Sequence, residues 1–301
     1  MNCLFGEGGC RVSFSSEVKQ YLCEIKERKN CCHKSLLYGL LLPSRITKHS
    51  IVLKTEHKNV AALAEELITN LYPFKAVILE VNNGYELHVE SSQDVDFILA
   101  ELPLESDYIN DKLFGCEHCI MVFIRGIFLS CGNVTTPEKS YHLEMIIGKK
   151  HIDSIKKQLS EVSFSPKRII RGQSLSLYYK DSSRIEDFLA YIGATKHSLE
   201  VMNTKITKEM RNNINRLTNC ETANIDKAVT AAAIQLEAIR KLDEQSEIGK
   251  LPPELKETAL KRIEYPEMSL EEFRHMFVPE ISKSGIYHRL QKIVAIADEI
   301  K

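Results

Sequence analysis

The stretch FIRGIFLSCGNV, residues 123–134, decides the fold: it is an apolar run with a glycine in its first half. The earlier apolar run LYGLL, residues 37–41, carries a glycine in the same setting. A glycine within a helix costs about 1 kcal/mol relative to alanine, so its recurrence needs a physical cause. The simplest cause is close packing of two helix backbones at Gly39 and Gly126.

The predicted elements around these two helices occur twice in the same order. In the first copy, periodicity predicts a helix at 32–42, a strand pair within 45–55, a helix at 59–71, strands at 75–81 and 85–90, and a closing helix at about 91–102. In the second copy, it predicts a helix at 117–130, strands near 133–135 and 140–147, a helix at 149–161, strands at 167–171 and 174–179, and a helix at 182–191. Each half therefore reads α-β-β-α-β-β-α.

This order predicts an α+β fold in which two four-stranded antiparallel sheets lie under a pair of central helices. The duplicated domain is expected to span residues 12–195, with repeats at about 31–104 and 116–193. Asn83 and Gly84 separate two β-rich runs, which is the strongest short-range signal for a hairpin. The repeat therefore accounts for the first two thirds of the chain.

The last third reads as helical throughout. Helices are predicted at 203–217 and 225–242 with a break at 219–224, so that residues 196–250 form a helical linker region. Residues 251–301 are expected to form a compact all-α domain. Four apolar residues of its first helix are predicted to face the core: Leu255, Ala259, Leu260 and Ile263. Ser269 opens a capping box before a short second helix, and Ser282 caps a third helix.

The third helix carries the candidate binding residues. No acidic residue occurs between residues 282 and 297, in a chain whose acidic and basic residues otherwise balance. A short helix followed by a basic helix is typical of a helix-turn-helix that reads the DNA major groove. An ordinary solvated face is the alternative, and the missing acids favour DNA. Lys283, Arg289 and Lys292 are expected to contact phosphates, and Ser284, Tyr287 and His288 to face base edges.

Composition excludes several classes of protein. The 301 residues include 40 Lys and Arg against 41 Asp and Glu, a formal charge of −1, which excludes a uniformly basic nucleic-acid coat. No run of about 18 apolar residues occurs, so no membrane partner is expected. Because residues 1–11 lack the pattern of a secretion signal, the expected location is the cytoplasm, in association with the nucleoid.

The nine cysteines are expected to be thiols, because no secretion signal accompanies them. Two clusters stand out, CCH at residues 31–33 and CEHC at residues 116–119. A zinc site needs about four ligands in a tetrahedron, and a CxxC pair supplies two. Neither cluster alone completes a recognised spacing, so buried structural cysteines are favoured over a metal site.

Two resemblances agree with this reading. The duplicated unit, opening on helices with L-x-G-L-like spacing, resembles the LAGLIDADG homing endonuclease fold. Five further motifs, together with residues 123–134, look like signatures of the WhiA family of bacterial sporulation and cell-division regulators: SFSSEVK (13–19), PEKSYHLE (137–144), NRLTNC (215–220), LPPEL (251–255) and ISKSGIYHRL (281–290). The resemblance implies that residues 1–11 are an N-terminal extension. It also implies that the partners are promoters of cell-division or sporulation genes and, with them, a sigma factor or other regulator.

The LAGLIDADG resemblance also bears on catalysis. It places Ser44 and Cys131 where the nucleases carry the acids that hold divalent cations. Neither residues 43–47 nor residues 130–136 contain Asp or Glu, so a non-enzymatic DNA-binding regulator without a cofactor is expected. An endonuclease is the unfavoured alternative.

The role of the two sheets stays open at this stage. The second repeat offers four cations for a DNA saddle: Lys167, Arg168, Arg171 and Lys180. The first repeat offers Glu80, Glu86 and Glu90 in the matching hairpin, and these carboxylates would repel phosphate. A solvated sheet edge is favoured, and a scaffold that binds a protein or a small effector is an alternative main function.

Overall fold

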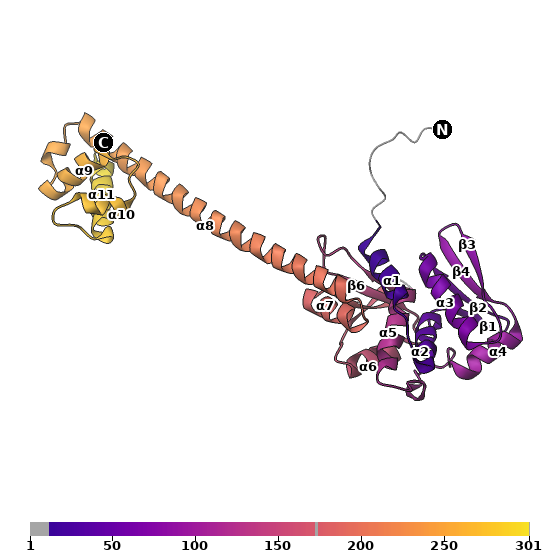
Figure 1. The fold of residues 1–301 in the computed structure, drawn as a ribbon. Helices are drawn as coiled ribbons and strands as arrows, with labels where there is room; N and C mark the ends of the chain where they lie inside the picture. Colours follow the sequence, from indigo (N-terminus) through magenta and orange to yellow (C-terminus); the bar gives the residue numbers. More distant parts are fainter. Residues whose placement is uncertain (1–11, 172–173, 301) are drawn as a thin grey trace. The chain divides into compact units, whose positions relative to one another are not determined.

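The computed structural model describes residues 12–171 and 174–300 (Figure 1). The chain divides into two compact units, Met1–Lys208 and Glu209–Lys301. The division falls inside the expected helical linker of residues 196–250. The proposed extension at residues 1–11 lies outside the described residues.

The first unit contains the duplicated domain, which confirms the prediction from the repeat. A helix α1 (Phe14–Glu24) precedes it. The first copy consists of α2 (Asn30–Leu41), β1 (Arg45–Thr47), β2 (Ser50–Thr55), α3 (Lys58–Leu71), β3 (Val77–Val81), β4 (Gly84–Val89) and α4 (Ser92–Glu101). After a short 3-10 helix η1 (Asp111–Leu113), the second consists of α5 (His118–Cys131), β5 (Gly132–Val134), β6 (Leu143–Ile147), α6 (Ile152–Glu161), β7 (Lys167–Arg171), β8 (Ser174–Tyr179) and α7 (Ser182–Tyr191).

Both sheets have the same antiparallel topology. Their strand orders are β1-β2-β4-β3 and β5-β6-β8-β7. The predicted hairpin joins β3 and β4, where Val81 pairs with Gly84. Gly84 has φ 141°, and a Cβ there would lie 2.4 Å from the carbonyl oxygen of Thr55. Only glycine fits this turn, which explains the signal in the sequence.

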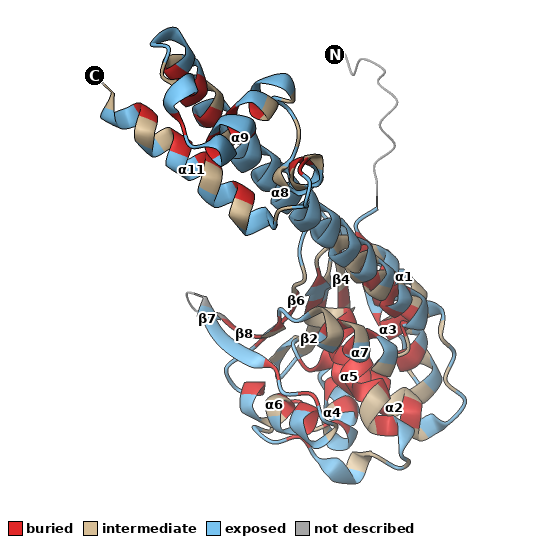
Figure 2. Cartoon of the chain, turned by 90° about the vertical axis from the view of Figure 1, so that its left-hand side faces the viewer, coloured by how far each residue is buried: buried red, intermediate tan, exposed pale blue. Residues whose placement is uncertain are grey.

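The central helices α2 and α5 pack against each other through the two glycines. A Cβ on Gly39 would lie 2.1 Å from the carbonyl oxygen of Phe123, and one on Gly126 would lie 2.5 Å from that of Leu36. Figure 2 shows buried residues, in red, concentrated on α2 and α5. The helix backbones therefore meet directly at the centre of the core, as the recurrence of glycine predicts.

One charged residue lies within this core. Arg125, in the middle of α5, is 2% exposed. Its guanidinium forms an ion pair with Glu27 and donates from Nε to the carbonyl oxygen of Ile192, 2.7 Å away. A buried guanidinium must be paired and hydrogen-bonded to be tolerated. These contacts therefore join α5 to the segments that follow α1 and α7.

Helix α8 (Thr195–Glu244) corrects one prediction, because it is continuous through residues 219–224. The predicted break rested on Asn and Thr residues, which lower helix propensity by only a few tenths of a kcal/mol each. Neither Gly nor Pro occurs between residues 195 and 244, so nothing in the sequence forces an interruption.

The C-terminal core uses the last turns of α8 together with the following helices: η2 (Ile248–Lys250), α9 (Pro253–Glu264), α10 (Leu270–Phe273), η3 (Arg274–Met276) and α11 (Lys283–Glu299). On α9, Leu255 and Ala259 are buried as predicted, but Leu260 and Ile263 are exposed. Thr258 and Arg262 face inward instead, because they share a helical face with Leu255. Leu260 points away from the core, because it lies about 100° around the helix axis from the buried Ala259. Among the described residues, no helix is long and apolar enough to cross a membrane.

Candidate nucleic-acid interface

Helices α10 and α11 have the arrangement expected of a helix-turn-helix. Ser269 and Glu272 form the predicted capping box at the start of α10. Ser282 caps α11 by accepting a hydrogen bond from the backbone N–H of Gly285, 3.1 Å away. The side chains between the helices are fully buried: Phe273, Ile286, Leu290 and Ile293. Each of the two helices is thus capped at its start, and both contribute side chains to the apolar core.

Two basic residues of α9 hold this turn in place. Arg262 is 3% exposed and donates from Nη1 to the carbonyl oxygen of Met268, 2.6 Å away. Lys261 donates to the carbonyl oxygen of Met276, and its Nζ lies 4.4 Å from the ring centroid of Phe277. Because both cations bind backbone carbonyls around α10 and η3, they set the position of the short helix relative to α9.

Helix α11 presents a polar face free of carboxylates. From its start to residue 292, its exposed side chains are Lys283, Ser284, Tyr287, His288, Gln291 and Lys292. The first acid after Ser282 is Asp298, at the far end of the helix. Such a face is suited to a polyanion, because lysines supply charge while hydroxyl, imidazole and amide groups can reach base edges.

The ion pair of Lys283 leaves its ammonium available. Its Nζ lies 3.9 Å from Oε2 of Glu271, and both side chains are more than half exposed. Glu271 is also 2.8 Å from Nε of Arg274, which is the closer contact. Exposed pairs of this kind contribute little free energy, so a phosphate can displace the carboxylate.

Arg289 has different surroundings from the other predicted site residues. Its side chain is 22% exposed, and Nη2 lies 3.3 Å from Oε2 of Glu254 on α9. Its guanidinium carbon lies 5.9 Å from the ring centroid of Phe277. Arg289 lies six residues after Lys283, which places its side chain about 240° around the helix axis from that of Lys283. Arg289 therefore faces α9. His288, Arg289 and Lys292 line one groove between α9 and α11.

The ends of the central helices lack the donors that a nuclease metal site needs. Ser44 and Cys131 line the same cavity of about 220 Å³, together with Lys150 and His151. No carboxylate lines this cavity among the described residues. Burial raises the pKa of the Cys131 thiol to about 12, so it is neutral near pH 7. A hard divalent cation prefers anionic oxygen, which neither residue provides.

Carboxylates do line the larger cavity on the other side of Cys131, about 610 Å³ in volume. One of them, Glu86, is held by Lys54 at 2.6 Å and His88 at 2.9 Å, and these hydrogen bonds lower its pKa. Buried Lys19 projects into the same cavity, and its burial lowers the pKa of its ammonium. The Glu86 carboxylate of this cavity is therefore already paired with an ammonium group.

The exposed face of the first sheet is more apolar than a DNA saddle. Three residues of the edge strand β3 are exposed hydrophobics at alternating positions: Val77, Leu79 and Val81. The neighbouring strand places Glu86 directly opposite Leu79 and Lys54. A surface that offers apolar side chains and a neutralised ion pair has little attraction for phosphate.

Comparison with known proteins identifies the chain. A family model described as the WhiA C-terminal HTH domain matches residues 214–297, and one described as the WhiA LAGLIDADG-like domain matches residues 120–211. The "Probable cell division protein WhiA" of Clostridium novyi (strain NT) is 35% identical to it, across 96% of this chain and 99% of that protein. The chain belongs to the WhiA family. The protein of the same name from Desulfitobacterium hafniense (strain Y51) is also 35% identical, across 96% of this chain and 97% of its own length.

The fold of this WhiA-family chain matches that of a solved relative. The crystal structure of full-length WhiA from Thermatoga maritima aligns with a TM-score of 0.59 at 24% identity, across 96% of this chain and 99% of that one. The two proteins therefore share a fold in which a LAGLIDADG-like domain precedes a helix-turn-helix domain.

Two features of the WhiA-family structure were missed from sequence. Lys19 gave no signal, because lysine is normally exposed and its position on α1 is unremarkable. Neither cysteine cluster has a complete ligand set by itself, although each lies at the start of the first helix of its repeat. That shared position in the repeat was the signal that could have placed the clusters together, as the structure does.

Proposed function

We propose that this chain is a non-enzymatic, DNA-binding transcription regulator of cell-division or sporulation genes. In this proposal, α11 reads promoter DNA and the LAGLIDADG-like domain is a scaffold. The observation that carries the proposal is the carboxylate-free, exposed face of α11 on a capped helix-turn-helix. Binding to promoters would place the protein at the nucleoid, beside a sigma factor or another regulator.

The residues of this face divide by chemistry. Lys283 and Lys292 would bind phosphates, which set affinity and its dependence on salt. Ser284, Tyr287 and His288 would meet base edges in the major groove. Arg289 is the third residue proposed to bind phosphate, and its contacts with Glu254 and Phe277 also support a packing role between α9 and α11.

The scaffold role of the LAGLIDADG-like domain rests on a separate observation. The exposed Val77, Leu79 and Val81 form an apolar stripe on the sheet that a DNA saddle would have to use. Apolar side chains at the outer face of an edge strand favour contact with a protein surface over contact with phosphate. Protein binding by this sheet is therefore the second candidate function.

A DNA-binding assay on the full chain tests the proposal. Fluorescence anisotropy with a promoter duplex should show affinity that falls steeply between 50 and 200 mM salt, by about tenfold or more, because phosphate contacts release counterions. The double variant Lys54→Glu/Lys167→Glu changes charge on the two sheets and should bind with unchanged affinity. Loss of binding in that variant would mean that the sheets still hold DNA.

The absence of cleavage is a separate expectation. Because Ser44 and Cys131 stand at the helix ends, supercoiled plasmid incubated with the full chain and Mg²⁺ or Mn²⁺ should stay supercoiled. The control is a Ser44→Asp/Cys131→Asp variant, which tests whether the acids alone restore a metal site. Nicking by the unmodified chain, abolished by chelator, would contradict the non-enzymatic role.

A further inference from the structure

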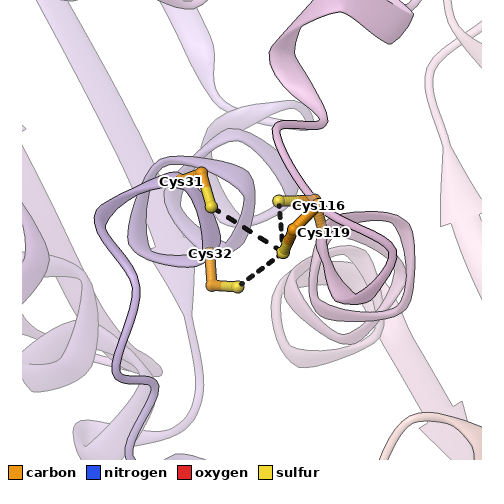
Figure 3. Close-up of side chains that lie close together, drawn as sticks. All are labelled: Cys31, Cys32, Cys116 and Cys119. Carbon is orange, nitrogen blue, oxygen red and sulfur yellow. Dashed lines mark hydrogen bonds between the residues drawn. The ribbon is translucent and has the colours of Figure 1, made fainter.

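Four cysteines from the two repeats meet at one point of the LAGLIDADG-like domain (Figure 3). Cys31 and Cys32 lie in the first turn of α2, while Cys116 and Cys119 lie at the start of α5. The four Sγ atoms lie within 4.8 Å of one another. Cys32 and Cys119 are buried, and the other two are half-buried.

The close packing of α2 and α5 produces this convergence. Both helices begin at the same side of the domain, and their glycines let the backbones touch further along. Beside the cluster, a Cβ on Gly115 would lie 3.0 Å from Cβ of Cys31, so the segment before α5 is also close. Side chains in the first turns of two such helices point into the same space.

We propose that these four cysteines bind one structural zinc ion. With Zn–S bonds of about 2.3 Å, the edge of a tetrahedral ZnS₄ unit is about 3.8 Å long. The observed Sγ···Sγ distances from Cys116 are 3.7 Å to Cys31, 3.6 Å to Cys32 and 3.5 Å to Cys119. Three of the six edges thus already have nearly the length found in a metal tetrahedron, and the other three are no longer than 4.8 Å.

The donor set decides the class of metal and of site. Four soft thiolates select zinc over Mg²⁺ or Ca²⁺, which take oxygen ligands. Binding replaces four S–H bonds with four Zn–S bonds and releases four protons, so the ZnS₄ unit carries a charge of −2. With all four positions filled by protein, no site is left for water or substrate, so the ion is structural.

The surroundings favour this negative charge. The cluster lies at the N-terminal ends of α2 and α5, where helix dipoles stabilise anions. Neither helix start has a hydrogen bond from a capping side chain. The backbone N–H groups of Cys32 and Cys119 donate to the carbonyl oxygens of Lys29 and Cys116, whereas that of His118 donates to the sulfur of Cys116. His33 takes no part, because its Nε2 is 2.9 Å from the carbonyl oxygen of Glu27.

The zinc ion would join the two repeats. It would tie the starts of the central helices together, at the opposite ends from Ser44 and Cys131. In this chain the metal would then bind at the starts of the central helices, where four thiolates form a closed site. The other ends of these helices, where the LAGLIDADG nucleases bind metal, lack suitable ligands. This role is independent of whether α11 binds DNA.

Metal analysis of the full-length protein tests the proposal. After purification without chelator and extensive dialysis, mass spectrometry of the metals should find one equivalent of zinc per chain. The Cys116→Ser variant should lose it, whereas the matched Cys220→Ser variant, which changes an exposed cysteine of α8, should keep it. A chelator that strips the metal should lower the melting temperature of the unmodified chain and of Cys220→Ser alike.

A second measurement covers the case in which Cys116→Ser does not fold. Exchange of the metal of the unmodified chain for Co²⁺ should give the visible bands of a tetrahedral cobalt thiolate. The zinc site would be disproved by a metal-free chain whose four thiols react with Ellman's reagent in the native state, by iron in place of zinc, or by full zinc content in a folded Cys116→Ser variant.

Discussion

The full-length Lys283→Glu/Lys292→Glu variant should bind promoter DNA at least about 50-fold more weakly than the unmodified chain near 0.1 M salt. Each lysine that neutralises a phosphate contributes about 0.9 to the slope of log K against log salt. Removing two such contacts should therefore lower the slope by about 2. Both side chains are exposed, so the fold should be unaffected.

A charge-matched control makes this result specific. Lys227→Glu/Lys256→Glu reverses two exposed lysines outside α11 and changes the net charge by the same amount. Anisotropy titrations at four salt concentrations should show its slope close to that of the unmodified chain. Equal losses in both variants would show that net charge, and not the face of α11, governs binding.

Substitution of Gly39 or Gly126 by valine should destabilise the LAGLIDADG-like domain by about 3 kcal/mol or more. The atoms that a Cβ would meet, 2.1 and 2.5 Å away, are backbone carbonyl oxygens, which cannot rotate aside as a side chain would. Relief would require α2 and α5 to move apart, and that would open the core around Phe123.

Hydrogen exchange measures this effect within each domain. Amides of α2 and α5 should lose protection in either valine variant, while amides of α11 in the other unit keep theirs. The control is Gly148→Ala, where a Cβ would meet no atom within 4 Å and little change in protection is expected. Unchanged protection of α2 in Gly39→Val would contradict direct contact of the helix backbones.

The architecture could be predicted from sequence because local and global signals agreed. Each repeat carried its own periodicity, turn and cap signals, and the recurring glycines identified the helix pair. The break expected at residues 219–224 was wrong because weak propensities were treated as a stop signal, whereas Gly and Pro are absent from all of α8. On α9, hydrophobicity favoured Ile263, but the face that packs includes Arg262, whose contacts with Met268 and Phe273 only the tertiary structure creates.

The candidate sites were less predictable, because they depend on contacts between distant residues. The six residues proposed on α11 came from local charge, but only the packing of α9 showed that Arg289 pairs with Glu254. The cysteine cluster brings Cys116 together with Cys31 and Cys32, which lie 85 and 84 positions earlier in the chain. Sequence spacing within one cluster could not reveal a ligand set shared between two repeats.

Cross-linking to DNA tests the central claim most directly. The full-length chain, bound to a promoter duplex in which thymines are replaced by bromodeoxyuridine, is irradiated and digested with trypsin, and the peptides bound to DNA are identified. We expect cross-links in residues 284–289, which contain Tyr287 and His288 on the exposed face of α11. Cross-links confined to strands β1–β8 of the LAGLIDADG-like domain, with none in α11, would contradict the account.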